Sequence, residues 1–358
     1  MKKIILILLL SVALVGCKKL FLGEDETNDP VNNFELFWQD FDQHYGLFQA
    51  RGWNWDSIYN VYQPQVTTQT TEKELWIVFR KMISYLDDRH TFIHSPSLNW
   101  TFGSGDEETR FVEGEFSLAL VKSKYLETWQ SIPNTGTHDQ DSYIYGKDEY
   151  IYGKVKDRDI GYVYLNGIEA DDRDFMDYVL RQIGIHKAII LDLRNNDGGD
   201  DLVAEAIASR FADGEHFIYT SQERNGPDHT DFAEKINYYT HISGNEHYSR
   251  PLIVLADKMT ISAGETLLLH LKAFSQVTQI GDTTSGDFSL ISMRRFLPNG
   301  WQYQYSVMMT LLPDGRSLDG KGHAPDIQIR NSAYNMQFGT DLVFEKAVEY
   351  LLDEYGIE

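Results

Sequence analysis

Ser262 is a candidate nucleophile because of its place in the chain. It follows an apolar run, 251–256, that predicts a buried strand, and it precedes a segment, 263–274, that predicts a helix. At the start of a helix, the dipole and the free N–H groups stabilise a developing negative oxygen. A serine there is also a good structural N-cap, with Glu265 three residues later as in a capping box. The residue alone leaves both roles open, and the cap is the simpler one.

Two further loops carry residues that could serve a serine nucleophile. Gly198 and Gly199 follow a predicted buried strand, 188–193. Paired glycines let backbone N–H groups hold a negative oxygen, although they also fit an ordinary tight turn. His90 follows a predicted helix; histidine is the usual base for serine, and it is also favourable at a helix end for its charge. Each loop alone therefore leaves a structural role open.

Four segments, taken in order, resemble the tricorn-core and C-terminal-processing family of serine peptidases over essentially the whole mature length. Leu86 to Thr91 is similar to the family's Leu-Asp-Asp-Gly-His-Thr run, with Arg89 in place of glycine. The other three segments are Asp192 to Gly199, Ser262 to Glu265, and Gly320 to Asp326. The resemblance implies an α/β fold with a ClpP/crotonase-like catalytic core.

Carried over to this chain, the resemblance implies roles for the residues of these motifs. Ser262 would be the nucleophile and His90 the general base. Backbone N–H groups of Gly198 or Gly199, together with that of Ala263, would form the oxyanion hole. The chemistry would proceed through an acyl-enzyme on a polypeptide substrate, with no metal and no cofactor.

One departure indicates the branch of the family. The processing proteases use a Ser–Lys dyad, but the matching segment here, 281–287, has Asp287 in place of the lysine. An aspartate cannot act as a neutral amine base. The chain therefore resembles the tricorn-like branch, which pairs serine with histidine and an acid. Asp319 is the candidate for the acid that orients His90, and Asp287 competes for that role.

The elements that must position these residues fall into an N-terminal helical part and an α/β part. Thr71 and Glu74 predict a capping box at the start of a helix that leads to the His90 loop. From residue 160 onward, strands and helices alternate, which is typical of a largely parallel sheet. Between the two parts, a strand at 116–121 and a hairpin at 143–155 predict a small β-rich insertion. Many relatives carry a PDZ domain at this place, and the resemblance implies that it is reduced or absent here. The predicted regions are a signal peptide (1–16), an acidic tether (17–31), a helical subdomain (32–95), the insertion (96–159) and the α/β core (160–358).

The N-terminus predicts export and lipidation. Lys2 and Lys3 precede an apolar run, 4–15, that is too short to span a bilayer, and then Gly16 and Cys17. This stretch resembles a bacterial lipobox, and Cys17 is the only cysteine, so we expect it to carry lipid rather than a disulfide. Lys18 is similar to the residue after the cysteine in lipoproteins sorted to the outer membrane. The formal net charge of −22 disfavours nucleic acid as a partner.

The sequence thus predicts a membrane-anchored serine endopeptidase of the cell envelope. A catalytically silent member of the same fold, binding peptides or proteins, is the alternative, and Arg89, Asp287 and the reduced insertion favour it. A third and weaker hypothesis is a lipoprotein that binds polysaccharide, suggested by Trp53, Trp55, Trp100 and Trp301.

Overall fold

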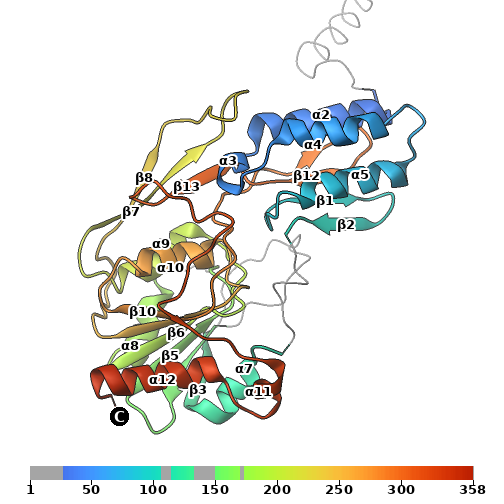
Figure 1. Ribbon diagram of the computed structural model, residues 1–358. Helices are drawn as coiled ribbons and strands as arrows, with labels where there is room; N and C mark the ends of the chain where they lie inside the picture. Colours follow the sequence, from blue (N-terminus) through green and yellow to red (C-terminus); the bar gives the residue numbers. More distant parts are fainter. Residues whose placement is uncertain (1–26, 106–113, 133–149, 170–172, 358) are drawn as a thin grey trace, which may run out of the picture.

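The computed structural model describes residues 27–105, 114–132, 150–169 and 173–357. Three sheets and their helices are arranged as an α/β layered part, an N-terminal helical part and a small sheet beside them (Figure 1). The α/β fold and the N-terminal helical region agree with the sequence prediction.

The largest sheet has seven strands in the order β14-β10-β9-β6-β5-β4-β3. The strands from β14 to β5 are parallel, and β4 and β3 extend the sheet as antiparallel strands. The central parallel strands β5, β6 and β9 are nearly continuous apolar runs, as expected where a sheet is covered on both faces. Their bounds are β3 (Leu126–Ile132), β4 (Tyr150–Val155), β5 (Ile160–Leu165), β6 (Ala188–Asp192), β9 (Leu252–Ala256), β10 (Val277–Gly281) and β14 (Ile327–Gln328).

Helices cover both faces of this sheet, and the alternation of side chains along each strand supplies both cores. In β6, Ile189 and Leu191 pack with α8, α9 and α10, while Ala188 and Ile190 lie on the other face with α12. The bounds are α8 (Phe175–Ile183), α9 (Asp201–Ser209), α10 (Ala263–Leu271) and α12 (Leu342–Tyr355), with shorter segments α7 (Leu118–Leu120), η2 (Val121–Tyr125) and α11 (Ala333–Gln337).

The N-terminal part is a second hydrophobic core, built from helices and a four-stranded sheet of order β11-β12-β1-β2. The predicted capping box is confirmed: the Thr71 and Glu74 side chains each bond the other's backbone N–H. Trp55 and Trp301 are fully buried in this core, so these two serve packing. The bounds are α2 (Pro30–His44), α3 (Phe48–Arg51), α4 (Trp55–Tyr62), η1 (Gln63–Gln65), α5 (Glu72–Ser84), β1 (Phe92–Ser95), β2 (Trp100–Gly103), β11 (Arg295–Phe296) and β12 (Gln302–Gln304).

A third sheet, which the sequence did not predict as a unit, has the order β13-β7-β8 and is antiparallel throughout. It comprises β7 (His216–Glu223), β8 (Ile236–Thr240) and β13 (Met308–Leu311). It lies on the side of the large sheet that carries α9 and α10 (Figure 1).

The structure corrects three of the predicted features. The predicted strand at 116–121 is wrong, because α7 begins at Leu118 and runs into η2. The predicted insertion is not a separate β unit, since β3 and β4 pair with β5 in the large sheet. The helical subdomain is not confined to 32–95 either, because β11 and β12 return to it from the C-terminal part of the chain. The first half of the predicted hairpin, 143–149, lies outside the described residues.

The topology brings the predicted site loops together. The segments that follow β6, β9 and β10 all leave the same edge of the sheet, because these strands are parallel neighbours. Ligands and reacting groups in open α/β sheets gather at the carboxyl edge in this way. Within the described ranges, no helix is long and apolar enough to cross a bilayer.

Candidate active site

Ser262 has the backbone conformation of a residue held for function. It lies directly before α10 with φ 56° and ψ −127°, a region that side-chain-bearing residues rarely adopt. Its side chain makes no capping hydrogen bond, and its N–H donates to the carbonyl oxygen of Asp287 at 3.2 Å. The structure therefore excludes the capping box, and the strained backbone instead leaves the hydroxyl uncommitted.

Gly198 faces this hydroxyl at a distance that only glycine allows. A Cβ on Gly198 would lie 2.6 Å from Cβ and 3.2 Å from Oγ of Ser262. Gly198 also has φ 92°, in the left-handed region. The glycine loop after β6 and the serine loop after β9 are thus in direct contact.

The three predicted oxyanion donors differ in this structure. The N–H of Gly198 already donates to Oδ1 of Asn196, at 3.0 Å. Across the described residues, no acceptor takes the N–H of Gly199 or of Ala263. These two amides are the ones available to bind a negative oxygen beside Ser262.

Asn196, which the sequence did not single out, locks the two loops together. It is fully buried, and its side-chain amide donates to the carbonyl of Leu165 at 2.8 Å. Its backbone carbonyl accepts the N–H of Ile261 at 3.0 Å. Asn196 therefore ties β5, the glycine loop and the serine loop at one point. The motif Asp192 to Gly199 includes Asn196, but the motif does not reveal that its partners are Leu165 and Ile261.

His90 lies on the loop after α5, and its backbone is fixed by Asp88. The N–H of His90 donates to Oδ1 of Asp88 at 3.0 Å, and the Thr91 hydroxyl donates to Oδ2 at 2.8 Å. Nδ1 of His90 is buried and has no hydrogen-bond partner among the described atoms. Within the same part of the chain, no hydrogen bond joins His90 to Ser262. Catalytic hydrogen bonds are often absent or long until substrate binds, so the pairing stays a prediction.

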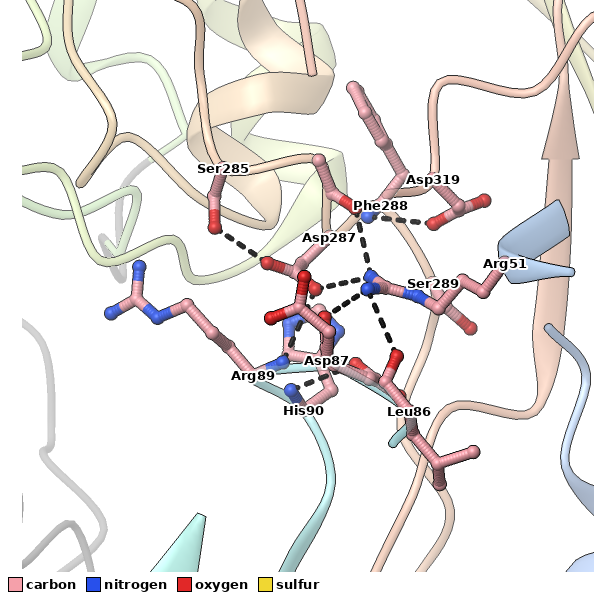
Figure 2. Close-up of polar contacts among 12 residues, drawn as sticks. Arg51, Leu86, Asp87, Arg89, His90, Ser285, Asp287, Phe288, Ser289 and Asp319 are labelled. Atoms are coloured by element: carbon pink, nitrogen blue, oxygen red, sulfur yellow. Dashed lines mark hydrogen bonds and ion pairs between the residues drawn. The ribbon is translucent and has the colours of Figure 1, made fainter. Parts of the chain in front are cut away.

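Asp287 links the loops that carry Ser262 and His90, and Figure 2 shows its side chain beside Arg89 and Ser285. Its carbonyl accepts the Ser262 N–H, and its Oδ1 accepts the N–H of Arg89 at 3.2 Å. The Ser285 hydroxyl donates to Oδ2 at 2.5 Å. The side chain at the family's lysine position is thus fully buried and structural in its contacts, rather than directed at Ser262.

Arg51, a residue that no sequence motif marked, neutralises Asp287. Its Nη2 lies 2.5 Å from Oδ1 of Asp287 in an ion pair buried on both sides, and it also donates to the Gly286 carbonyl at 3.0 Å. Its Nη1 donates to the carbonyl of Asp87 on the His90 loop. Figure 2 shows the guanidinium between these two loops. Arg51 belongs to α3, so the N-terminal part supplies the cation of the site.

Asp319 is buried near this ion pair but does not contact His90 in the described structure. Its Oδ1 accepts the N–H of Phe288 at 3.2 Å, and its Oδ2 accepts the Ser317 hydroxyl at 2.9 Å. Burial, with a contribution from the charge of Asp287, raises the pKa of Asp319 to about 7, although Arg51 opposes the shift. The prediction that Asp319 orients His90 therefore lacks a direct contact, and Asp287 is the acid nearer to the His90 loop.

Glu265 holds the Asp287 loop from one turn into α10. Its Oε1 accepts the N–H of Gly286 at 2.7 Å, and its Oε2 accepts the N–H of Asp287 at 2.8 Å. Burial, together with the charge of Asp287, raises the pKa of Glu265 to about 8, against the donors that lower it. The glutamate of the Ser-Ala-x-Glu motif thus supports the neighbouring loop rather than the helix end. Among the described residues, no cluster of metal-binding side chains occurs.

Comparisons with known proteins match two parts of this chain. Residues 159–329 match the family model described as peptidase family S41, and residues 27–84 match the tricorn protease C1 domain. A candidate peptidase from Parabacteroides merdae, known from its crystal structure, has a TM-score of 0.78 at 26% identity, over 91% of this chain and 98% of that one. Residues 159–329, just under half of the chain, thus resemble the S41 family of serine-type peptidases.

Two curated relatives come from Bacillus subtilis strain 168. The carboxy-terminal processing protease CtpB is 25% identical over 183 residues, which are 51% of this chain and 36% of that protein. The carboxy-terminal processing protease CtpA is 28% identical over 178 residues, which are 49% of this chain and 36% of that protein. The chain thus spans about a third of the length of these relatives.

Proposed function

We propose that this protein is a serine endopeptidase of the cell envelope, of the tricorn-like branch, that cleaves polypeptides through an acyl-enzyme. One observation carries the proposal: the strained Ser262 presents a hydroxyl without a capping bond beside Gly198, with the free amides of Gly199 and Ala263 at hand. The match of residues 27–84 to the tricorn C1 domain supports the branch. The ClpP/crotonase-like core is part of the same proposal.

In this mechanism, Ser262 attacks the scissile carbonyl while His90 takes its proton and later returns it to the leaving amine. The amides of Gly199 and Ala263 hold the oxyanion of the tetrahedral intermediate. Arg51 and Asp287 hold the loops that carry Ser262 and His90 in their relative positions. The processing proteases' lysine has no counterpart here, because Asp287 stands in its place and is already paired with Arg51.

Hydrolysis of an unfolded protein substrate tests the proposal. The Ser262→Ala variant should lose this activity and keep the thermal midpoint of the parent, because the Ser262 side chain forms no cap that alanine would remove. A structural N-cap serine would behave in the opposite way, retaining hydrolysis and losing about 1 kcal/mol of stability.

The second candidate is a catalytically silent binder of peptides or proteins. It is favoured by the unpartnered Nδ1 of His90 and by the missing bond between His90 and Ser262 in the described structure. A parent protein that binds the substrate without hydrolysing it, and whose binding survives Ser262→Ala, would support this candidate.

A further inference from the structure

A cavity lies between the small sheet and the helices α9 and α10. Three of its lining residues are chain neighbours of the site. Thr266 is one helical turn beyond Ser262, Asp201 is two residues beyond Gly199, and Phe288 follows Asp287. A substrate residue bound at Ser262 would therefore place its side chain next to this cavity.

The walls of the cavity are mostly apolar and aromatic. Tyr219 and Tyr238, from β7 and β8, stack with ring centroids 4.4 Å apart, and Leu269 and Met308 add aliphatic surface. Leu290, which is 50% exposed, lies on the solvent side. Such walls suit the long methylene stem of a side chain.

Two polar groups line the cavity, and one of them lacks a hydrogen-bond partner. Oγ of Ser221 has no hydrogen-bond partner among the described atoms, and the residue is 1% exposed. Asp201, at the start of α9, is the second polar group, and its carboxyl group accepts the Thr266 hydroxyl. Burial raises the pKa of Asp201, against the Thr266 hydroxyl and the nearby His90, which lower it. Among the described lining residues there is no lysine or arginine to neutralise it.

We infer that this cavity is the pocket for the substrate side chain on the acyl side of the scissile bond, and that it selects lysine or arginine. The inference rests on the proposed function. The stem would pack against the stacked tyrosines, whose ring faces attract a cation. The charged tip would reach Asp201 and Ser221, which gives the carboxylate a counter-charge and the hydroxyl a hydrogen bond.

The structure also offers a plain alternative for Asp201. It lies in the first turn of α9, where an acidic side chain stabilises the helix whatever the substrate. That role would affect stability and would leave the choice of substrate unchanged, so an experiment on selectivity separates the two.

Peptidyl diphenyl phosphonates provide the measurement, because the serine attacks phosphorus and expels phenoxide only when the pocket accepts the reagent's side chain. The rate of modification of Ser262 would be compared for reagents that carry lysine, leucine or glutamate at that position. A fluorophosphonate without such a side chain reports the reactivity of Ser262 alone. For the parent, we expect lysine to exceed leucine by about tenfold or more, since a desolvated charge pair discriminates strongly, and glutamate to be slowest.

Asp201→Asn should reduce the lysine-to-leucine ratio to about one, because the substitution removes the counter-charge. Each rate is divided by the fluorophosphonate rate of the same variant, which corrects for any change in the reactivity of Ser262 itself. Leu290→Lys, at the exposed mouth, should lower the ratio by repulsion without disturbing the fold. Asp200→Asn is the matched control: it removes the adjacent exposed charge, keeps a residue able to cap α9, and should retain the parent's ratio.

A parent without lysine preference, or a preference that survives Asp201→Asn, would overturn the inference while the fluorophosphonate still labels Ser262. If the fluorophosphonate fails to label the parent, the proposed function itself is contradicted and the pocket loses its role with it.

Discussion

At the scale of single residues, the site depends on a backbone conformation that no sequence motif reveals. Serine at φ 56° costs on the order of 1–3 kcal/mol relative to a relaxed backbone. Such strain persists when the surroundings fix it, and here the Asp287 carbonyl and the Gly198 contact do so. Ser262 is therefore better explained as a nucleophile than as a cap.

Asp319 gives a prediction at the same scale, through pH. Its pKa is about 7 in the folded protein and near 3.8 when unfolded, so between these values the folded state binds more protons. Stability linked to this group is complete below about pH 4 and is lost as the pH rises through 7. The asparagine of Asp319→Asn cannot ionise. The free energy of unfolding of this variant should therefore rise relative to that of the parent by at least about 1 kcal/mol between pH 5 and pH 8.

Chemical denaturation of both proteins at the two pH values measures this difference. If the gap between the Asn variant and the parent stays constant from pH 5 to pH 8, Asp319 titrates normally and is not held neutral by burial.

At the scale of elements, α3 and the loop after β10 are joined by one buried ion pair. Arg51→Met leaves the Asp287 carboxylate buried without its cation, which should cost about 3–5 kcal/mol. Asp287→Asn added to Arg51→Met should recover part of this loss, because the uncompensated charge is then gone. Arg51→Met alone and Asp287→Asn alone should also hydrolyse substrate more slowly than the parent, because the ion pair connects the His90 and Ser262 loops.

Urea unfolding and steady-state hydrolysis of the two single variants and the double variant form the test. Arg316→Met, which breaks an exposed pair with Asp314, is the control and should leave the midpoint unchanged. Strictly additive effects for Arg51 and Asp287 would show that the pair does not couple the two elements.

Many of the helices and strands could be predicted from the sequence, and the predictions that failed did so for physical reasons. Strong periodicity and caps located α5, and continuous apolar runs located β6 and β9. The segment from residue 116 was misread because five apolar residues in a short run fit a strand as well as a helix. Arg51 and Asn196 were missed because their partners are far away in sequence, and only the fold brings them together.

At the scale of the whole molecule, the proposal places a serine peptidase on a membrane through its N-terminus. That prediction concerns residue 17, outside the described residues, and rests on the sequence alone. Cys17→Ser should move the protein from the membrane fraction to the soluble fraction, because acyl chains would be its anchor. Fractionation of cells that express either form measures this. Parent and variant sedimenting alike with membranes would count against lipidation.

The central claim is that Ser262 is an activated nucleophile served by His90. Labelling with a fluorophosphonate, followed by mass spectrometry of the modified peptide, tests it most directly because only an activated serine reacts. The parent should be labelled at Ser262, Ser262→Ala should not be labelled, and His90→Ala should react at least about a hundredfold more slowly, as loss of a general base requires. A parent that stays unlabelled, or a His90→Ala variant that reacts like the parent, would contradict the account.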